Sequence, residues 1–268
     1  MLRRLILLAL ALAVAQPAAA VTKVLVTVVD KKTGQPLTGL KADDFVVSID
    51  KKTRRAVEAC EFQTGIIDVM MLVDSSMIGQ MVSSIAPDMI GQLAEKEQMA
   101  IVSYHSSADL IQEFTSSKDL LRQSLSRVEF GNSPRLLDAV YAAAQSGFEG
   151  TAFRRVILLL TTGVDGQGRV GLKETVRVAR RNGVSVFPVF VMGYGRAQLE
   201  DLARLTGGAA FDLRAMAKPG NPPPPQRIFE VMRGHYVITL QGNLPLGDDL
   251  NIEVKNQKKL LISYLELN

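Results

Sequence analysis

Apolar residues recur at every second position near both ends of the chain. Residues 45–49 show this alternation most clearly in the first part, and residues 250–254 show it in the last part. A period of two is typical of half-buried antiparallel strands. About forty residues are too few to bury a core alone. We therefore predict that the N-terminal β segment, 21–62, pairs with a C-terminal β segment, 235–268, to form a small β-sandwich.

The middle of the chain, 63–234, has a different pattern. Short apolar runs typical of strands buried on both faces occur at 67–73, 99–104, 156–160 and 184–191. Segments with helical spacing lie between them, at 117–128, 136–144 and 172–181. This alternation predicts an α/β fold: a doubly wound, mostly parallel sheet with helices on both faces, inserted between the two β segments.

Prolines mark two irregular places in this middle part. Pro87 predicts a kink, or a helix that restarts with Pro87 in its first turn. Four consecutive prolines fall within residues 217–225, which we predict to be an extended loop that acts as a spacer.

The first twenty residues have the pattern of a signal peptide. Arg3 and Arg4 precede an apolar run from Leu5 to Ala15, and three small residues end at Ala20. The run is too short for a membrane span, which needs about 20 apolar residues. We expect cleavage after Ala20, export to a periplasmic or extracellular location, and no transmembrane span in the remaining chain.

Composition excludes several classes of protein. The single Cys rules out a disulfide scaffold and a multi-Cys zinc site, and the two His residues leave little for a His-based metal centre. The formal charge is +4, and two of the positive residues lie in the predicted leader. The rest of the chain is nearly neutral, so no nucleic-acid partner is expected.

The candidate functional residues lie in three segments that should meet at the carboxyl edge of the sheet. This edge is the usual ligand position in open α/β sheets. The three segments contribute, in chain order, Asp74, Ser75, Ser76, Met77 and Ile78; then Asn132, Ser133 and Arg135; and then Thr162 and Asp165.

These segments resemble the motifs of the von Willebrand factor type A domain, of the bacterial secreted kind. That family has Asp-x-Ser-x-Ser after the first strand, a Thr shortly before a Leu-Tyr-Asp-Ala helix, and Thr-Asp-Gly after a later strand. The matching segments here are 74–78, 133–139 and 161–165. Residues 202–211 resemble the family's closing segment, and 38–45 resemble the β segment that accompanies its secreted members. The resemblance implies a protein-binding module with a metal-ion-dependent adhesion site.

The metal-binding part of that pattern is degenerate. Asp74 and Ser76 keep two of the family positions, but Ile78 and Pro134 stand where two hydroxyl ligands belong, and Thr162 stands where a carboxylate belongs. Because a hard cation needs several oxygen ligands, we predict no metal and no cofactor. We expect Asp74 instead to accept hydrogen bonds from backbone N–H groups at the start of the following helix, so that Asp74→Ala has the effect of a lost helix cap, about 1 kcal/mol.

The pattern therefore predicts a secreted, non-catalytic module that binds a protein partner in the cell envelope or outside the cell. The predicted binding face is the loop face at the carboxyl ends of the strands, formed by the candidate residues in 74–78, 132–135 and 162–165. Two alternative functions are also protein binding. One is metal-dependent adhesion through a site rebuilt by Asp165 or Ser133, and the other is a scaffold that binds through its β-sandwich or its Pro-rich loop. A third alternative is a hydrolase that uses Ser75 or Ser76 with His105, although no Gly-x-Ser-x-Gly elbow surrounds the serines.

Five methionines near the first strand are predicted to be mostly core residues, except Met77.

Overall fold

The structure is a computed structural model that describes residues 20–50, 52–191, 193–217, 220–244, 250–257 and 259–267. The predicted signal peptide, except for Ala20, lies outside the described residues. None of the helices within the described ranges is long and apolar enough to cross a membrane.

A six-stranded sheet with the order β10-β9-β8-β5-β6-β7 forms the centre of the α/β part. Its strands are β5 (Ile67–Asp74), β6 (Gln98–Tyr104), β7 (Ala108–Thr115), β8 (Arg154–Thr161), β9 (Val184–Phe190) and β10 (Phe211–Asp212). All neighbours are parallel except β6 and β7, which form an antiparallel hairpin. Every residue of β5 is buried, because helices cover both faces of the sheet.

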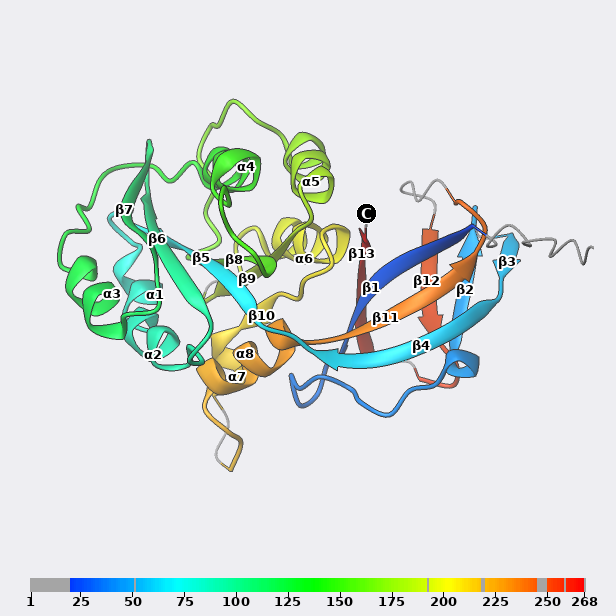
Figure 1. Ribbon diagram of the computed structural model, residues 1–268. Coiled ribbons are helices and arrows are strands. Elements are labelled where there is room, and N and C mark those ends of the chain that lie inside the picture. The colour runs from blue at the N-terminus through cyan, green and yellow to red at the C-terminus, as the bar shows by residue number, and fades with distance from the viewer. Residues whose placement is uncertain are drawn as a thin grey trace, which may run out of the picture.

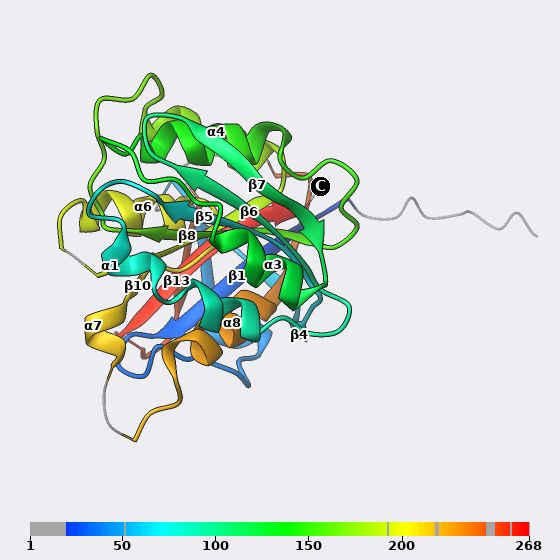
Figure 2. The same ribbon diagram turned by 90° about the vertical axis from the view of Figure 1, so that its left-hand side faces the viewer.

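Two groups of helices cover the two faces. One face packs against α1 (Gln80–Ser83), α2 (Ala86–Gly91), α3 (Lys118–Leu125), α7 (Leu213–Met216) and α8 (Pro224–Arg233). The other face packs against α4 (Leu136–Ser146), α5 (Leu172–Arg181) and α6 (Arg196–Leu205). Figure 2 shows α4 and α6 above the sheet and α3, α7 and α8 below it.

The two ends of the chain build two further antiparallel sheets. One has the order β13-β1-β11-β4, and the other has the order β12-β2-β3 with a short 3-10 helix, Ala42–Asp44, before β2. The strands are β1 (Val21–Asp30), β2 (Phe45–Ile49), β3 (Thr53–Arg55), β4 (Val57–Thr64), β11 (Gly234–Gln241), β12 (Leu250–Val254) and β13 (Leu260–Leu267). N-terminal strands pair with tail strands, as in the register Val24–Ile238 and Val47–Ile252. The two sheets share one apolar core, to the right of the α/β part in Figure 1.

The fold class is therefore as predicted: a mostly parallel sheet between helices, with extra antiparallel sheets from the chain ends. The division of the chain into domains at residues 62 and 234 stays a prediction. A pair of glycines joins the two parts closely, since Thr27 Oγ1 donates to Gly207 O at 2.8 Å and Ser263 Oγ donates to Gly208 O at 2.5 Å. A Cβ on Gly208 would lie 1.9 Å from Val186 O, so only glycine fits there.

The structure around the prolines agrees with the prediction at Pro87 but differs from it in the Pro-rich loop. Pro87 lies in the first turn of a restarted helix, α2, which is one of the two predicted outcomes. The Pro-rich loop is shorter than predicted, because Pro224 and Pro225 already belong to α8 and Pro225 is buried. Proline is well tolerated at the first helical positions, where its missing N–H would have no partner. Two residues of the predicted loop, 218 and 219, lie outside the described residues.

Candidate functional site

The predicted candidate residues meet at the carboxyl edge of the central sheet. The segment after β5 pairs with the loop before α4, where Gly131 N donates to Ser75 O at 2.9 Å. Across the sheet, the end of β5 contacts the end of β8 through Asp74 and Thr162. The fold thus brings together three segments that are about thirty to sixty residues apart in sequence.

Asp74 lies beneath this edge, with both carboxylate oxygens engaged. Its Oδ1 accepts from Ser76 N at 2.9 Å. Its Oδ2 accepts from Thr162 N at 3.0 Å and from Thr162 Oγ1 at 2.8 Å. Both residues are fully buried, with exposed fractions of 0%. Asp74 thus accepts from backbone N–H groups, but neither belongs to the start of α1, where Gly79 at the cap position supplies no side-chain hydrogen bond. The bonds from Thr162 instead tie the end of β5 to the end of β8.

The two serines after Asp74 are also buried. Ser75 is 0% exposed and Ser76 is 2% exposed, and neither hydroxyl has a hydrogen-bond partner among the described residues. His105 is not paired with either of them, since its Nδ1 lies 2.7 Å from Ser106 N, which donates to it. A serine nucleophile needs an adjacent base to remove its proton. The geometry thus offers no activated serine for the hydrolase alternative.

Asp165 and Ser133, the two groups that would have to rebuild a metal site, make no hydrogen bond to Asp74 within the described part of the chain. Asp165 Oδ1 accepts from Leu136 N at 2.9 Å and so caps α4, and its Oδ2 accepts from Gln198 Nε2 at 3.3 Å. Burial raises the pKa of the Asp165 carboxyl above its ordinary value. Ser133 is exposed, and it is followed by the buried Pro134.

Several large apolar side chains are exposed at this edge. Met77 is 77% exposed and Ile78 is 42% exposed, next in the chain to the buried Asp74 and Ser76. Met70, Met71 and Met89 are buried, as predicted for most of these methionines, but Met81 on α1 is 51% exposed. Tyr194, in the loop after β9 at the same edge, is 67% exposed. We call Met77, Ile78, Met81 and Tyr194 the apolar rim.

Of the other predicted face residues, Asn132 is exposed and Arg135 is half-buried at the start of α4. Four predicted face residues, Asp74, Ser75, Ser76 and Thr162, lie below the surface rather than on it. Tyr194, which lies between Gly193 and Gly195, was not among the candidate residues. A large apolar residue between glycines in a loop was the available signal, since such a loop cannot bury it easily.

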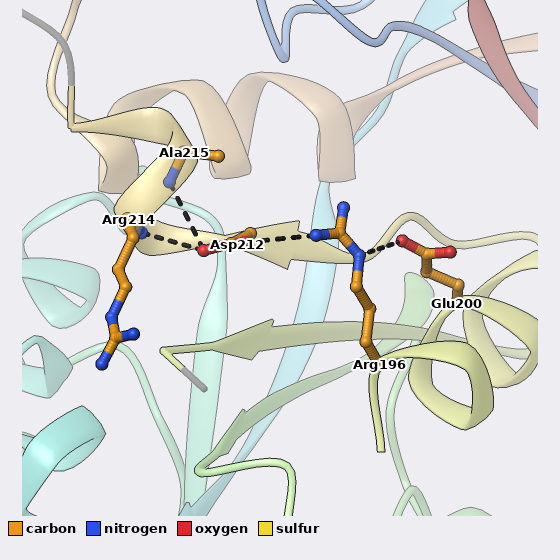
Figure 3. Close-up of polar contacts among 5 residues, drawn as sticks. All are labelled: Arg196, Glu200, Asp212, Arg214 and Ala215. Atoms are coloured by element: carbon orange, nitrogen blue, oxygen red, sulfur yellow. Dashed lines mark hydrogen bonds and ion pairs between the residues drawn. The ribbon is translucent and has the colours of Figure 1, made fainter. Parts of the chain in front are cut away.

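A polar cluster fixes the segments beside the apolar rim (Figure 3). Arg196, the first residue of α6, donates to Glu200 Oε1 at 2.8 Å and lies 3.5 Å from Asp212 Oδ2. Asp212 in turn caps α7, because its Oδ1 accepts from Arg214 N at 3.0 Å and from Ala215 N at 3.4 Å. This chain of contacts holds the loop after β9, which carries Tyr194, against the end of β10.

The donor set at this edge does not fit a divalent cation. Three donors already occupy the oxygens of Asp74, and the oxygens of Asp165 are bound to Leu136 N and Gln198 Nε2. The described residues contain no group of three or more His, Cys, Asp or Glu side chains that could hold a metal. A hard cation takes six or more oxygen ligands, and carboxylates carry most of the affinity.

Comparisons with known proteins agree with this fold. The family model of the von Willebrand factor type A domain matches residues 68–219. No curated protein matches the sequence significantly.

Among solved structures, the chain is similar to proximal thread matrix protein 1 from the mussel byssus. One crystal form, described as having a zinc-occupied MIDAS motif, matches with a TM-score of 0.55 at 16% identity over 66% of this chain and 49% of that protein. A second crystal form matches with a TM-score of 0.53 at 14% identity, over 72% and 50% of the two chains. The chain thus spans about half the length of the mussel protein, and at this identity the likeness concerns the fold alone.

A further similar structure is the conserved hypothetical protein BatB from Bacteroides thetaiotaomicron. The TM-score is 0.48 at 15% identity, over 63% of this chain and 97% of that chain.

Proposed function

Because the chain belongs to the von Willebrand factor type A family, whose domains are generally non-catalytic modules that bind proteins, we propose that it binds a protein partner through the carboxyl edge of its central sheet. The observation that carries this proposal is the apolar rim. Four large apolar side chains, exposed by 42–77%, stand on three segments of one edge. Exposed apolar groups that lie together on a polar surface mark sites of protein association.

We further propose that this binding does not depend on a divalent metal. In the family, the partner supplies a carboxylate to the metal ion. Here the surface above Asp74 carries Met77 and Ile78, and Thr162 donates a hydrogen bond to the carboxylate that the metal would need. Contact between apolar surfaces would then supply the affinity that the metal supplies in other members.

The proposed location is outside the cytoplasm, in the periplasm or beyond the cell. This part of the proposal rests on the leader pattern of residues 1–20, in which a basic start is followed by an apolar run and small residues. The partner would then be a protein of the cell envelope or of the extracellular space.

Site-specific photo-crosslinking tests the binding surface. A photoreactive residue at Met77 is expected to crosslink to a discrete protein in cells that carry this chain. The matched control is the same residue at Leu120 on α3, which is 50% exposed but lies away from the edge. Ile78→Asp should reduce the yield at position 77 at least fivefold. Crosslinks that form equally at Leu120, or only at Glu58 on β4, would overturn the proposed surface in favour of a scaffold.

Calorimetric titration with Mg²⁺, Mn²⁺, Ca²⁺ and Zn²⁺ tests metal independence. We expect no binding in the micromolar range. The matched variant restores the family pattern with Ile78→Ser, Pro134→Thr and Thr162→Asp together, and it should gain binding of at least one of these ions. Micromolar binding by the natural sequence that Asp74→Ala abolishes would contradict the proposal.

A further inference from the structure

A second candidate site lies at the opposite end of the central sheet. There the four-stranded terminal sheet faces the amino ends of β8 and β9, and a cleft of about 590 Å³ remains between them. Its walls come from the loop 151–153, the start of β8, the end of α5, and strands β1, β4, β11 and β13. The volume is in the range of small-molecule sites.

Positive charge dominates the wall on the α/β side. Arg154, Arg155 and Arg181 line the cleft, and Glu266 is the acidic residue among the lining side chains. Within the described part of the chain, none of the three arginines has an ion-pair partner within 4.0 Å. Asp68, across the β5–β8 ladder from Arg155, instead accepts from the backbone N–H groups of the loop at 152–153.

Arg154 is the most deeply placed of these cations. Its Nη1 donates to Met232 O at 2.6 Å and its Nη2 donates to Ser185 Oγ at 3.2 Å, and both acceptors are neutral. Its Nε is buried and has no hydrogen-bond partner among the described residues. Burial lowers the pKa of this guanidinium to about 9. A buried cation without a counter-charge is costly, and an anion in the cleft would offset that cost.

The opposite wall of the cleft is apolar. Val237, Leu25 and Leu265 are direct register partners across β11, β1 and β13, so their side chains lie in one row on one face of the sheet. The other face of this sheet is buried in the β-sandwich core, so the row faces the α/β part. Farther along the same face, Thr27 and Ser263 bind the Gly207–Gly208 segment. Leu25 and Leu265 are each only 2% exposed, so apolar surface reaches the cleft through the half-buried Val237 and through Phe153 and Leu267, which are exposed and also line it.

We propose that this cleft binds a small ligand that joins an oxyanion head, a carboxylate or a phosphate, to an apolar body. The arginines take the head, because guanidinium groups match the geometry of both oxyanions. Val237, Phe153 and Leu267 take the body. The site is separate from the apolar rim, since it lies at the amino ends of the strands.

Calorimetric titration of the purified protein with defined probes tests this site. Octanoate and octyl phosphate are expected to bind, and the tighter of the two identifies the head group. Octyltrimethylammonium should not bind, and acetate and inorganic phosphate should bind at least tenfold more weakly than the octyl compounds. Arg155→Gln and Arg181→Gln each should weaken binding at least threefold, and together at least tenfold, since each removes a charge-assisted contact.

Matched controls separate this site from general electrostatics and from the proposed protein-binding surface. Arg177→Gln changes an exposed arginine of the same helix that does not line the cleft, and it should leave the affinity unchanged. Ile78→Asp should also leave the affinity for octanoate unchanged. Equal binding of the cationic probe, or full affinity in the Arg155→Gln, Arg181→Gln double variant, would overturn the proposal.

Discussion

The two ends of strand β5 carry buried aspartates in opposite surroundings. At the carboxyl end, Asp74 accepts three hydrogen bonds, two of them from Thr162, and no cation contacts it. At the amino end, Asp68 accepts from two backbone N–H groups with one oxygen, while its other oxygen has no partner among the described residues. Arginines without ion-pair partners line the cleft nearby.

The difference shows that the neighbours of a carboxylate decide what its end of the sheet can bind. Neutral donors occupy both oxygens of the buried Asp74, and the exposed Met77 and Ile78 next to it in the chain are apolar. Near Asp68 the charges are not matched within the protein, because the arginines bind neutral acceptors instead. One edge therefore suits a protein surface, and the other suits an anion.

Replacing either buried aspartate should cause the largest losses of unfolding free energy, and the loss should be greater for Asp74 than for Asp68. Asp74→Ala leaves the two Thr162 donors and Ser76 N without acceptors, so we expect a loss of about 3 kcal/mol of unfolding free energy. That is more than the cap-sized loss predicted from sequence. Asp68→Ala leaves two amides and also removes an unpartnered oxygen, so about 2 kcal/mol is expected. Urea unfolding at pH 7 measures both, and the reverse order would contradict the comparison.

Acid should weaken the amino-end region through His235. Burial, and secondarily the charge of Arg154, lower the pKa of this imidazole to about 4 from its ordinary 6.5. Between these values the unfolded chain binds a proton that the folded protein does not, so the unfolding free energy falls as the pH falls from 6.5 to 4. The expected loss is about 2 kcal/mol by pH 5. In urea unfolding, the free energy of unfolding of His235→Gln should depend less steeply on pH across this range than that of the natural sequence. An identical pH dependence in the two proteins would refute the assignment to His235.

A smaller effect is expected at the carboxyl edge from Asp165→Ala. This side chain caps α4 at Leu136 N, and Arg135 at the cap position supplies no side-chain hydrogen bond. We expect a loss of about 1 kcal/mol in thermal or urea unfolding, typical of a lost cap. If Asp165 instead belonged to a metal site, Mg²⁺ would stabilise the natural sequence but not the variant. The difference in unfolding free energy between the two proteins would then be larger with Mg²⁺ than without it, and this result would contradict the assignment.

The smallest stability change is expected at the apolar rim. Met77→Ser should change the unfolding free energy by less than about 0.5 kcal/mol, because the side chain is already 77% exposed. The same change should reduce the crosslinking yield from a photoreactive residue at Ile78. A stability loss of more than about 1 kcal/mol would mean that Met77 packs against the fold and is not available to a partner.

Much of the architecture followed from local patterns. Continuous apolar runs such as 67–73 and 156–160 predicted strands buried on both faces, and alternation at 45–49 and 250–254 predicted strands that pair. These patterns are reliable because burial on one or two faces imposes a period on the residues themselves. The helix at Pro224 was not predicted, since proline excludes a helix interior but not its first turn.

The sequence by itself determined the order of the elements and the fold family, because both depend on residue type and spacing along the chain. Only the tertiary structure decided that Thr162 donates two hydrogen bonds to Asp74, that Met81 and Tyr194 are exposed, and that Arg154 donates to neutral acceptors. These facts depend on distances between residues far apart in sequence. Hydrogen bonding and charge pairing act within a few ångströms, so they are settled only when packing brings the strands and loops together.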